Sequence, residues 1–171
     1  MIVAQARTPA FYRDYGVADT LAGRFDMILL HLVLVVRRLQ RESGSIRALG
    51  QGVFDLFCRD MDHSLREMGI GDLAVPTHMR GVAEAFYGRA SAYDEAIDRG
   101  KADDLATVLA RNIFPDAAVP SAGARRMAAY MRAAIDELER HDAESLARAL
   151  VSFPDPQAIA APDQRREETN R

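Results

Sequence analysis

Residues 54–89 read FDLFCRDMDHSLREMGIGDLAVPTHMRGVAEAFYGR, and this stretch decides the fold. Up to Met68 its apolar residues recur at spacings of three and four, which is the pattern of one buried helix face. The following Gly69-Ile70-Gly71 stops that helix, with Gly69 suited to the left-handed position after a helix end. Pro76 favours the first turn of a second helix. We therefore predict helices over residues 53–68 and 77–99, joined by a tight corner.

The rest of the chain also has helical spacing. Met27–Val36 is apolar on nearly every side, which predicts a helix over residues 25–41 that is buried all round. Further helices are expected at residues 2–7, 103–113, 122–140 and 143–151, with an aromatic turn at 11–15, and Thr20 or Asp19, Ser121 and Asp142 as caps. No strand-like alternation of useful length occurs. The fold class expected is all-α: a single compact multi-helix domain around a central apolar helix, spanning residues 1–153, with a polar, disordered tail at 154–171.

Bulk composition excludes several classes of protein. A length of 171 residues favours one domain, and a net charge of −3 gives no reason to expect nucleic acid sequence recognition. No polybasic run suits an anionic membrane surface, so at most peripheral membrane contact is expected. The longest apolar stretch, residues 27–36, is too short for a membrane span, which needs about 20 residues. The chain has one cysteine and no recognisable signal peptide, which indicates a cytoplasmic protein. A single lysine among 22 basic residues is typical of a GC-rich bacterial genome.

Residues 60–72 contain a cluster of side chains that can bind metals. It consists of Asp60, Asp62, His63, Glu67 and Asp72, and His63 and Glu67 share a helix face because they are four residues apart. A dinuclear carboxylate site would need an EXXH pair on facing helices, and the chain has no such pair. We interpret the cluster as a solvated charged face or a partner-binding face, with no metal and no cofactor.

Two buried-looking reactive residues also have structural interpretations. His31 interrupts the apolar helix, where a core histidine with a backbone partner is commoner than a haem ligand. Cys58 lies on the core stripe, which favours an inert thiol. The chain has no GxSxG, phosphate loop, CxxC or dinucleotide fingerprint. The sequence therefore predicts no catalytic residue and no enzyme.

Three blocks of sequence resemble those of a known family. They are PAFY at 9–12 with GVADTLAGRFD at 16–26, the apolar helix MILLHLVLVVRRL at 27–39, and the opening stretch, above all residues 62–72 and AFYG at 85–88. In this order and spacing the chain resembles the ubiquinol–cytochrome c reductase chaperones, assembly factors of the cytochrome bc complex. The resemblance runs from residue 2 to 89 and weakens through residue 154. Family members carry a further helical stretch before the element at residues 2–7, so the first helix here is expected to be shortened.

The resemblance implies a non-enzymatic chaperone that binds newly made cytochrome b. It also implies a small partner protein or the ribosome as further partners, and work at the cytoplasmic face of the inner membrane. The signature residues cluster at the corner, whose apolar GIGDLAVP segment can border a groove for a partner helix. The predicted partner-binding residues are Phe11, Tyr12, Asp62, Arg66, Glu67, Met68, Gly69, Ile70, Gly71, Asp72 and Leu73.

Other interpretations stay open from the sequence. The signature residues can instead hold the two helices and their corner in register. The helices can also enclose an apolar pocket, which would make the protein a carrier of a lipid or another small apolar ligand. A di-metal enzyme of the helical-bundle type is a third alternative.

Overall fold

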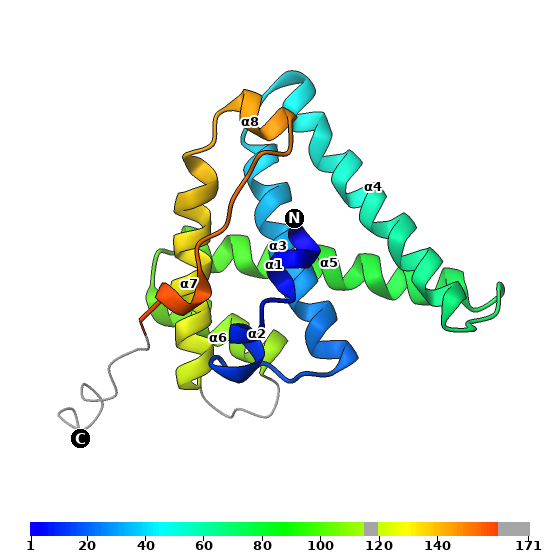
Figure 1. The fold of residues 1–171 in the computed structure, drawn as a ribbon, viewed down its shortest axis with the longest axis horizontal. Helices are drawn as coiled ribbons and strands as arrows, with labels where there is room; N and C mark the ends of the chain where they lie inside the picture. The colour runs from blue at the N-terminus through cyan, green and yellow to red at the C-terminus, as the bar shows by residue number, and fades with distance from the viewer. Residues whose placement is uncertain (115–119, 161–171) are drawn as a thin grey trace.

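A computed structural model describes residues 1–114 and 120–160 of the chain (Figure 1). These residues contain no strand, which confirms the all-α fold. They form the helices α1 Ile2–Ala6, α2 Pro9–Arg13, α3 Leu21–Gln40, α4 Gly44–Glu67, α5 Val75–Asp98, α6 Ala102–Ile113, α7 Ala122–Glu139 and α8 Ala143–Ala147, and the 3₁₀ helix η1 Pro156–Ala158. None of the helices in the described ranges is long and apolar enough to cross a membrane.

Helix α3 is the centre of the molecule, as its apolar sequence predicts. The Thr20 hydroxyl accepts a hydrogen bond from the Gly23 backbone amide at 3.1 Å and caps its first turn. Every residue from Met27 to Val36 is buried. Helices α1, α4, α5, α6 and α7 all pack against α3, so it has no free apolar face along this segment.

One side of α3 is closed by α1, α2 and α7. His31 is fully buried there: its Nδ1–H donates to the Met27 carbonyl at 2.7 Å, and its Nε2 accepts from the Tyr130 hydroxyl at 2.8 Å. Gln5 on α1 donates to the same hydroxyl. Burial lowers the pKa of His31 to about 4, so the ring is neutral at pH 7. The structural interpretation of His31 is confirmed, with Tyr130 as a second partner.

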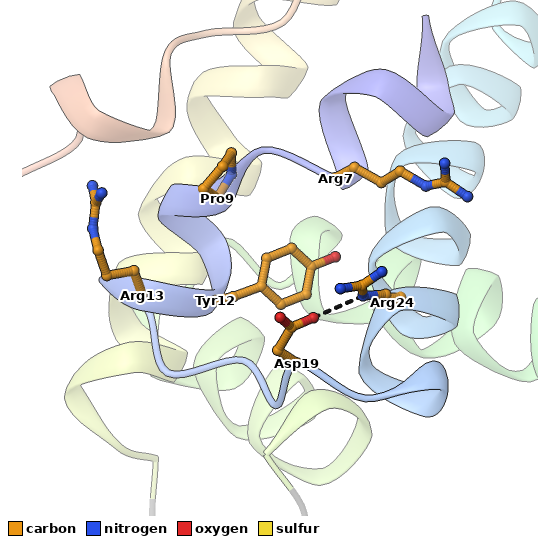
Figure 2. A pocket seen from close by; sticks show the side chains of 6 residues that line it. All are labelled: Arg7, Pro9, Tyr12, Arg13, Asp19 and Arg24. Atoms are coloured by element: carbon orange, nitrogen blue, oxygen red, sulfur yellow. Dashed lines mark hydrogen bonds and ion pairs between the residues drawn. The ribbon is translucent and has the colours of Figure 1, made fainter.

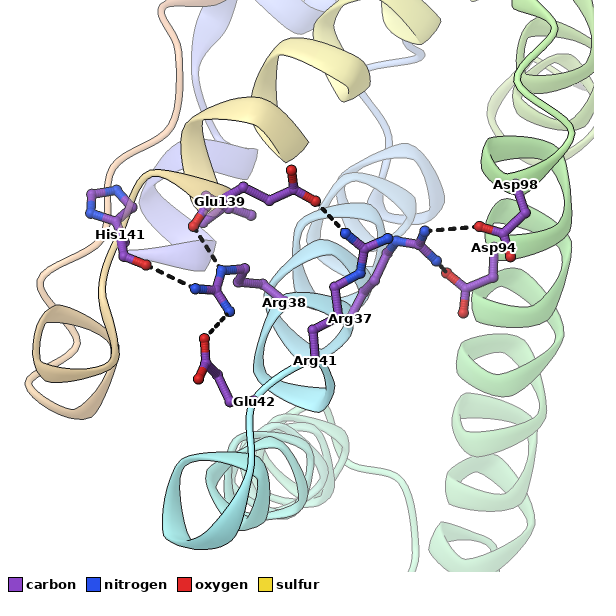
Figure 3. Close-up of polar contacts among 9 residues, drawn as sticks. Arg37, Arg38, Arg41, Glu42, Asp94, Asp98, Glu139 and His141 are labelled. Atoms are coloured by element: carbon purple, nitrogen blue, oxygen red, sulfur yellow. Dashed lines mark hydrogen bonds and ion pairs between the residues drawn. The ribbon is translucent and has the colours of Figure 1, made fainter.

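The C-terminal end of α3 is fixed by its arginines (Figure 3). Arg37 pairs with Asp94 and Asp98 of α5, and Arg41 pairs with Glu139 of α7. Arg38 donates to two backbone carbonyls at the end of α7, those of Leu138 and His141, at 3.0 and 2.8 Å. These arginines, at the C-terminal end of α3 where cations complement the helix dipole, therefore also connect this end to α5 and α7.

Helix α4 begins at Gly44, nine residues before the predicted start at Val53. Gly50 and Gly52 weaken the helical pattern in this segment. Gly50, however, is buried against Leu39 of α3, and this packing stabilises the helix despite its poor propensity. Helix α8 ends at Ala147 rather than Val151, since Ala149 has a positive φ of 55°.

Residues 154–160, which the sequence assigns to the tail, pack against the domain. The Pro156 carbonyl accepts a hydrogen bond of 2.7 Å from the buried Tyr15 hydroxyl. The carbonyls of Pro154 and Ile159 accept from Gln5 and Arg126. Three backbone carbonyls thus connect this seven-residue segment of the predicted tail to the domain, which composition alone does not reveal. Residues 161–171 of that tail lie outside the described residues.

Candidate functional site

The predicted corner lies at the far end of an arm formed by α4 and α5 (Figure 1, right). Gly69 has φ 83°, and the Ile70 amide donates to the Leu65 carbonyl at 3.0 Å, so a left-handed residue closes α4 as the sequence predicts. Val75 is buried and anchors the start of α5. Leu73 is 97% exposed and stands at the tip of the arm.

The charged residues of the corner are bonded to one another. Arg66 donates to Asp62 at 2.7 Å and also pairs with Asp72 across the turn. The hydrogen bond from Arg66 lowers the pKa of the Asp62 carboxyl. Glu67 pairs with His63 one turn earlier, at 3.2 Å. Arg66 therefore connects the last turn of α4 to the loop, which supports the interpretation that these residues hold the corner in register.

Phe11 and Tyr12 lie apart from the corner. Both are on α2, in the lower middle of Figure 1, whereas the corner is at the right. Phe11 is fully buried against the rings of Tyr15, His31 and Tyr130, so it cannot touch a partner in this structure. Tyr12 is half-buried, and its hydroxyl donates to the Ala6 carbonyl at 2.8 Å. The predicted site residues are thus brought together only in part.

An apolar groove of about 460 Å³ opens where α3 and α4 diverge. One wall carries Leu21, Phe25 and Ile28 of α3, and the other carries Met61 and Leu65 of α4 and its C-cap residue Met68. Leu21 is 73% exposed and Met68 is 55% exposed, so the lips of the groove are in solvent. The remaining lining residues are Arg7, Ala22, Arg24, Ser64 and Val82.

A second, polar hollow of about 480 Å³ adjoins this groove (Figure 2). Arg7, Pro9, Tyr12, Arg13, Asp19 and Arg24 line it, and Arg7 and Arg24 line both hollows. Arg24 donates to Asp19 at 2.7 Å, whereas Arg13 pairs with Asp14. Burial raises the pKa of Tyr12, while the nearby cations Arg24 and Arg7 act in the opposite direction. The apolar groove and the polar hollow therefore meet at Arg7 and Arg24.

The described residues give little support for two other kinds of chemistry, metal binding and nucleophilic attack by a thiol. Within residues 1–114 and 120–160, no three His, Cys, Asp or Glu side chains lie close enough together to hold a metal ion. Four members of the Asp60–Asp72 cluster are in the ion pairs described above: Asp62 and Asp72 pair with Arg66, and His63 pairs with Glu67. Cys58 is half-buried against the core, and burial raises the pKa of its thiol, which disfavours the nucleophilic thiolate.

Comparison with known proteins gives the family of the chain. The sequence model of the ubiquinol–cytochrome C chaperone family matches residues 13–153. The chain belongs to this family. It is also similar to a solved structure, the crystal structure of the Cbp3 homolog from Brucella abortus, with 41% sequence identity and a TM-score of 0.84. That match covers 93% of this chain and 87% of the other one. No curated protein matches the chain.

For this chaperone family member, some candidate residues lie inside the range that matches the family model and others lie before it. It includes the corner, both walls of the groove and Arg24, whereas Arg7, Phe11 and Tyr12 precede it. Most groove residues were missed as site residues by sequence reasoning, which assigned Met61 and Leu65 to the core stripe of α4. The available signal was a second stripe of identical spacing at residues 21, 25 and 28, just before the fully apolar segment of α3.

Proposed function

We propose that this protein is an assembly chaperone of ubiquinol–cytochrome c reductase that holds newly made cytochrome b until it is assembled. The observation that carries the proposal is the family match over residues 13–153, supported by the likeness to the Cbp3 homolog. The open apolar groove supports it physically, because a membrane subunit outside the bilayer needs its apolar segments covered.

The geometry suits binding that must be reversible. Stable protein interfaces bury about 800 Å² on each partner. The groove is short and its lips are in solvent, so it covers less than this by itself. A chaperone has to release its client, and a limited contact allows fast release. Its methionines, Met61 and Met68, can adapt to irregular apolar partners. None of these steps requires catalysis, in keeping with a non-enzymatic role.

The corner is proposed as a second contact, for the client or for a small partner protein or ribosome. Leu73 and Met68 are exposed apolar side chains there, flanked by Asp62, Arg66 and Glu67. A fixed turn that presents an exposed leucine between charges suits a peripheral protein contact. We further propose that the protein works at the cytoplasmic face of the inner membrane, where its client is inserted.

A carrier function is the second candidate, and one observation favours it. The groove is apolar and has Arg7 and Arg24 at its edge, which is also an arrangement that fits an acyl chain with an anionic headgroup. Native mass spectrometry of gently purified protein tests this candidate. A stoichiometric lipid or quinone adduct would favour a carrier, and a clean mass of the free protein would count against it.

The proposed function is tested by recovering a tagged chain from gently solubilised membranes and identifying bound proteins by mass spectrometry. Enrichment of cytochrome b over other abundant membrane proteins is the expected result. A deletion strain should also contain less assembled cytochrome bc complex. Absence of enrichment together with normal complex levels in the deletion strain would refute the proposal.

A further inference from the structure

We propose that the groove between α3 and α4 takes about two turns of a client helix with an acidic side chain beside its apolar stripe, paired with Arg7 and Arg24. The proposal rests on the proposed function, since the helix is part of the membrane subunit that the chaperone holds. It specifies the shape and charge of the bound segment and the residues that recognise this segment.

The spacing of the walls indicates a helical occupant. Leu21, Phe25 and Ile28 stand at positions i, i+4 and i+7 of α3. Met61, Leu65 and Met68 stand at the same intervals along the end of α4, with Met68 as its C-cap residue. Each wall therefore presents one straight ridge of side chains about two turns long. A third helix packs between two such ridges by inserting its own i, i+3, i+4 and i+7 side chains. Val82 of α5 completes the lining.

The arginines set the charge of the occupant. Arg7 comes from the end of α1 and Arg24 from α3, and both line the apolar groove and the polar hollow beside it (Figure 2). Arg24 is held by Asp19, whereas Arg7 has no ion pair among the described residues of the chain. A carboxylate on the bound helix can reach this edge without leaving water completely. Such rim charges contribute mainly to orientation and partner choice.

A binding assay with designed peptides tests both features on the full chain. The probe is an alanine-based helix of about 18 residues, long enough to be helical alone, with leucines at i, i+4 and i+7. One version has Glu beside the leucine stripe, and another has Lys at the same positions. We expect the Glu peptide to bind about fivefold more tightly, and the variant R7E/R24E to reverse this order. Arg13→Glu, which changes the polar hollow alone, should leave the order unchanged.

Apolar substitutions test the groove itself. Leu65→Asp should weaken peptide binding at least about tenfold, because it places a charge on one wall. Leu56→Asp is the matched control, since Leu56 is an exposed leucine of the same helix outside the groove. Equal affinities for the Glu and Lys peptides, or equal effects of the two leucine variants, would overturn the proposal. Far-UV circular dichroism establishes that each variant is folded.

Crosslinking in cells separates this proposal from the proposed function. A photoreactive phenylalanine analogue is placed at Leu65, at Leu73 or at Leu56 in three otherwise identical chains. We expect cytochrome b to be crosslinked from Leu65 and not from Leu56. Crosslinks to cytochrome b from Leu73 alone would overturn the groove assignment and leave the proposed function intact. A lipid crosslinked from Leu65 would overturn it in favour of a carrier. Cytochrome b absent from every crosslink and from the membrane pull-down would refute both.

Discussion

Helices α3 and α4 are neighbours, but α3 is apolar on nearly every side over Met27–Val36, whereas α4 has a single apolar stripe. Twelve of the 20 residues of α3 are buried, against three of the 24 residues of α4. The packing partners match this difference: α3 is surrounded by five helices, whereas α4 meets α3, α5 and the short α8. An apolar stripe on its own therefore predicts a surface that needs cover, and the topology decides whether the protein or a partner supplies it.

The largest difference between the two regions is expected in stability. Leu30→Ala in the centre of α3 should lower the free energy of unfolding by about 2–5 kcal/mol, because Leu30 is fully buried and its removal leaves a cavity. Leu65→Ala in the groove should cost less than about 1 kcal/mol, since this side chain already meets solvent. Urea unfolding followed by circular dichroism measures both. Similar losses for the two variants would mean that the groove is part of the closed core.

A second test uses the buried histidine of the closed region. The pKa of His31 falls from 6.5 to about 4 on folding, so between these pH values the unfolded chain binds a proton that the folded chain does not. Stability is therefore fully present above pH 6.5 and falls as the pH is lowered toward 4, by an amount on the order of 3 kcal/mol. The difference in unfolding free energy between the parent chain and His31→Gln, measured across this range, isolates the effect. A pH-independent difference would contradict it.

Much of the fold could be predicted because its signals are local. Three caps act as the sequence indicates: Thr20, Ser121 and Asp142 accept hydrogen bonds from backbone amides three residues later. The stop at Gly69 and the burial of the Met27–Val36 segment follow from local patterns in the same way. These features depend on a few consecutive residues and their backbone preferences.

The features that could not be predicted depend on residues distant in the chain. Gly50 lies in a helix because Leu39 of another helix packs against it. Residues 154–160 are ordered by Tyr15, Gln5 and Arg126. The groove exists because α3 and α4 diverge beyond the segment where they are in contact. Phe57 and Leu65 belong to the same apolar stripe of α4, but Phe57 lies in the core and Leu65 lies at a surface. Sequence periodicity predicts which face of a helix is apolar, but not which other helix packs against that face.

Adding a single methyl group at Gly69 is expected to destabilise the corner. Gly69 has φ 83°, a conformation that other residues adopt at a cost, so Gly69→Ala should destabilise the chain by about 1 kcal/mol. Gly71→Ala is the matched control, because its φ is not positive and no atom would meet the added methyl in either position. The two urea unfolding curves give the comparison. Equal losses of stability for the two substitutions would show that the positive φ at residue 69 does not require glycine.

The smallest effect on stability is expected at Arg66, where the two roles proposed for the corner separate most clearly. The ion pairs of Arg66 with Asp62 and Asp72 are exposed, and water and salt screen such pairs, so the triple change D62A/R66A/D72A should leave the unfolding curve nearly unchanged. If the corner contacts a partner, the same variant should recover about threefold less cytochrome b from membranes, because interface charges guide association. Unchanged recovery with an intact fold would mean that these charges only hold the end of α4 to its loop. Binding would then depend on the apolar side chains alone, and Leu65→Asp would remain strongly defective in the same pull-down.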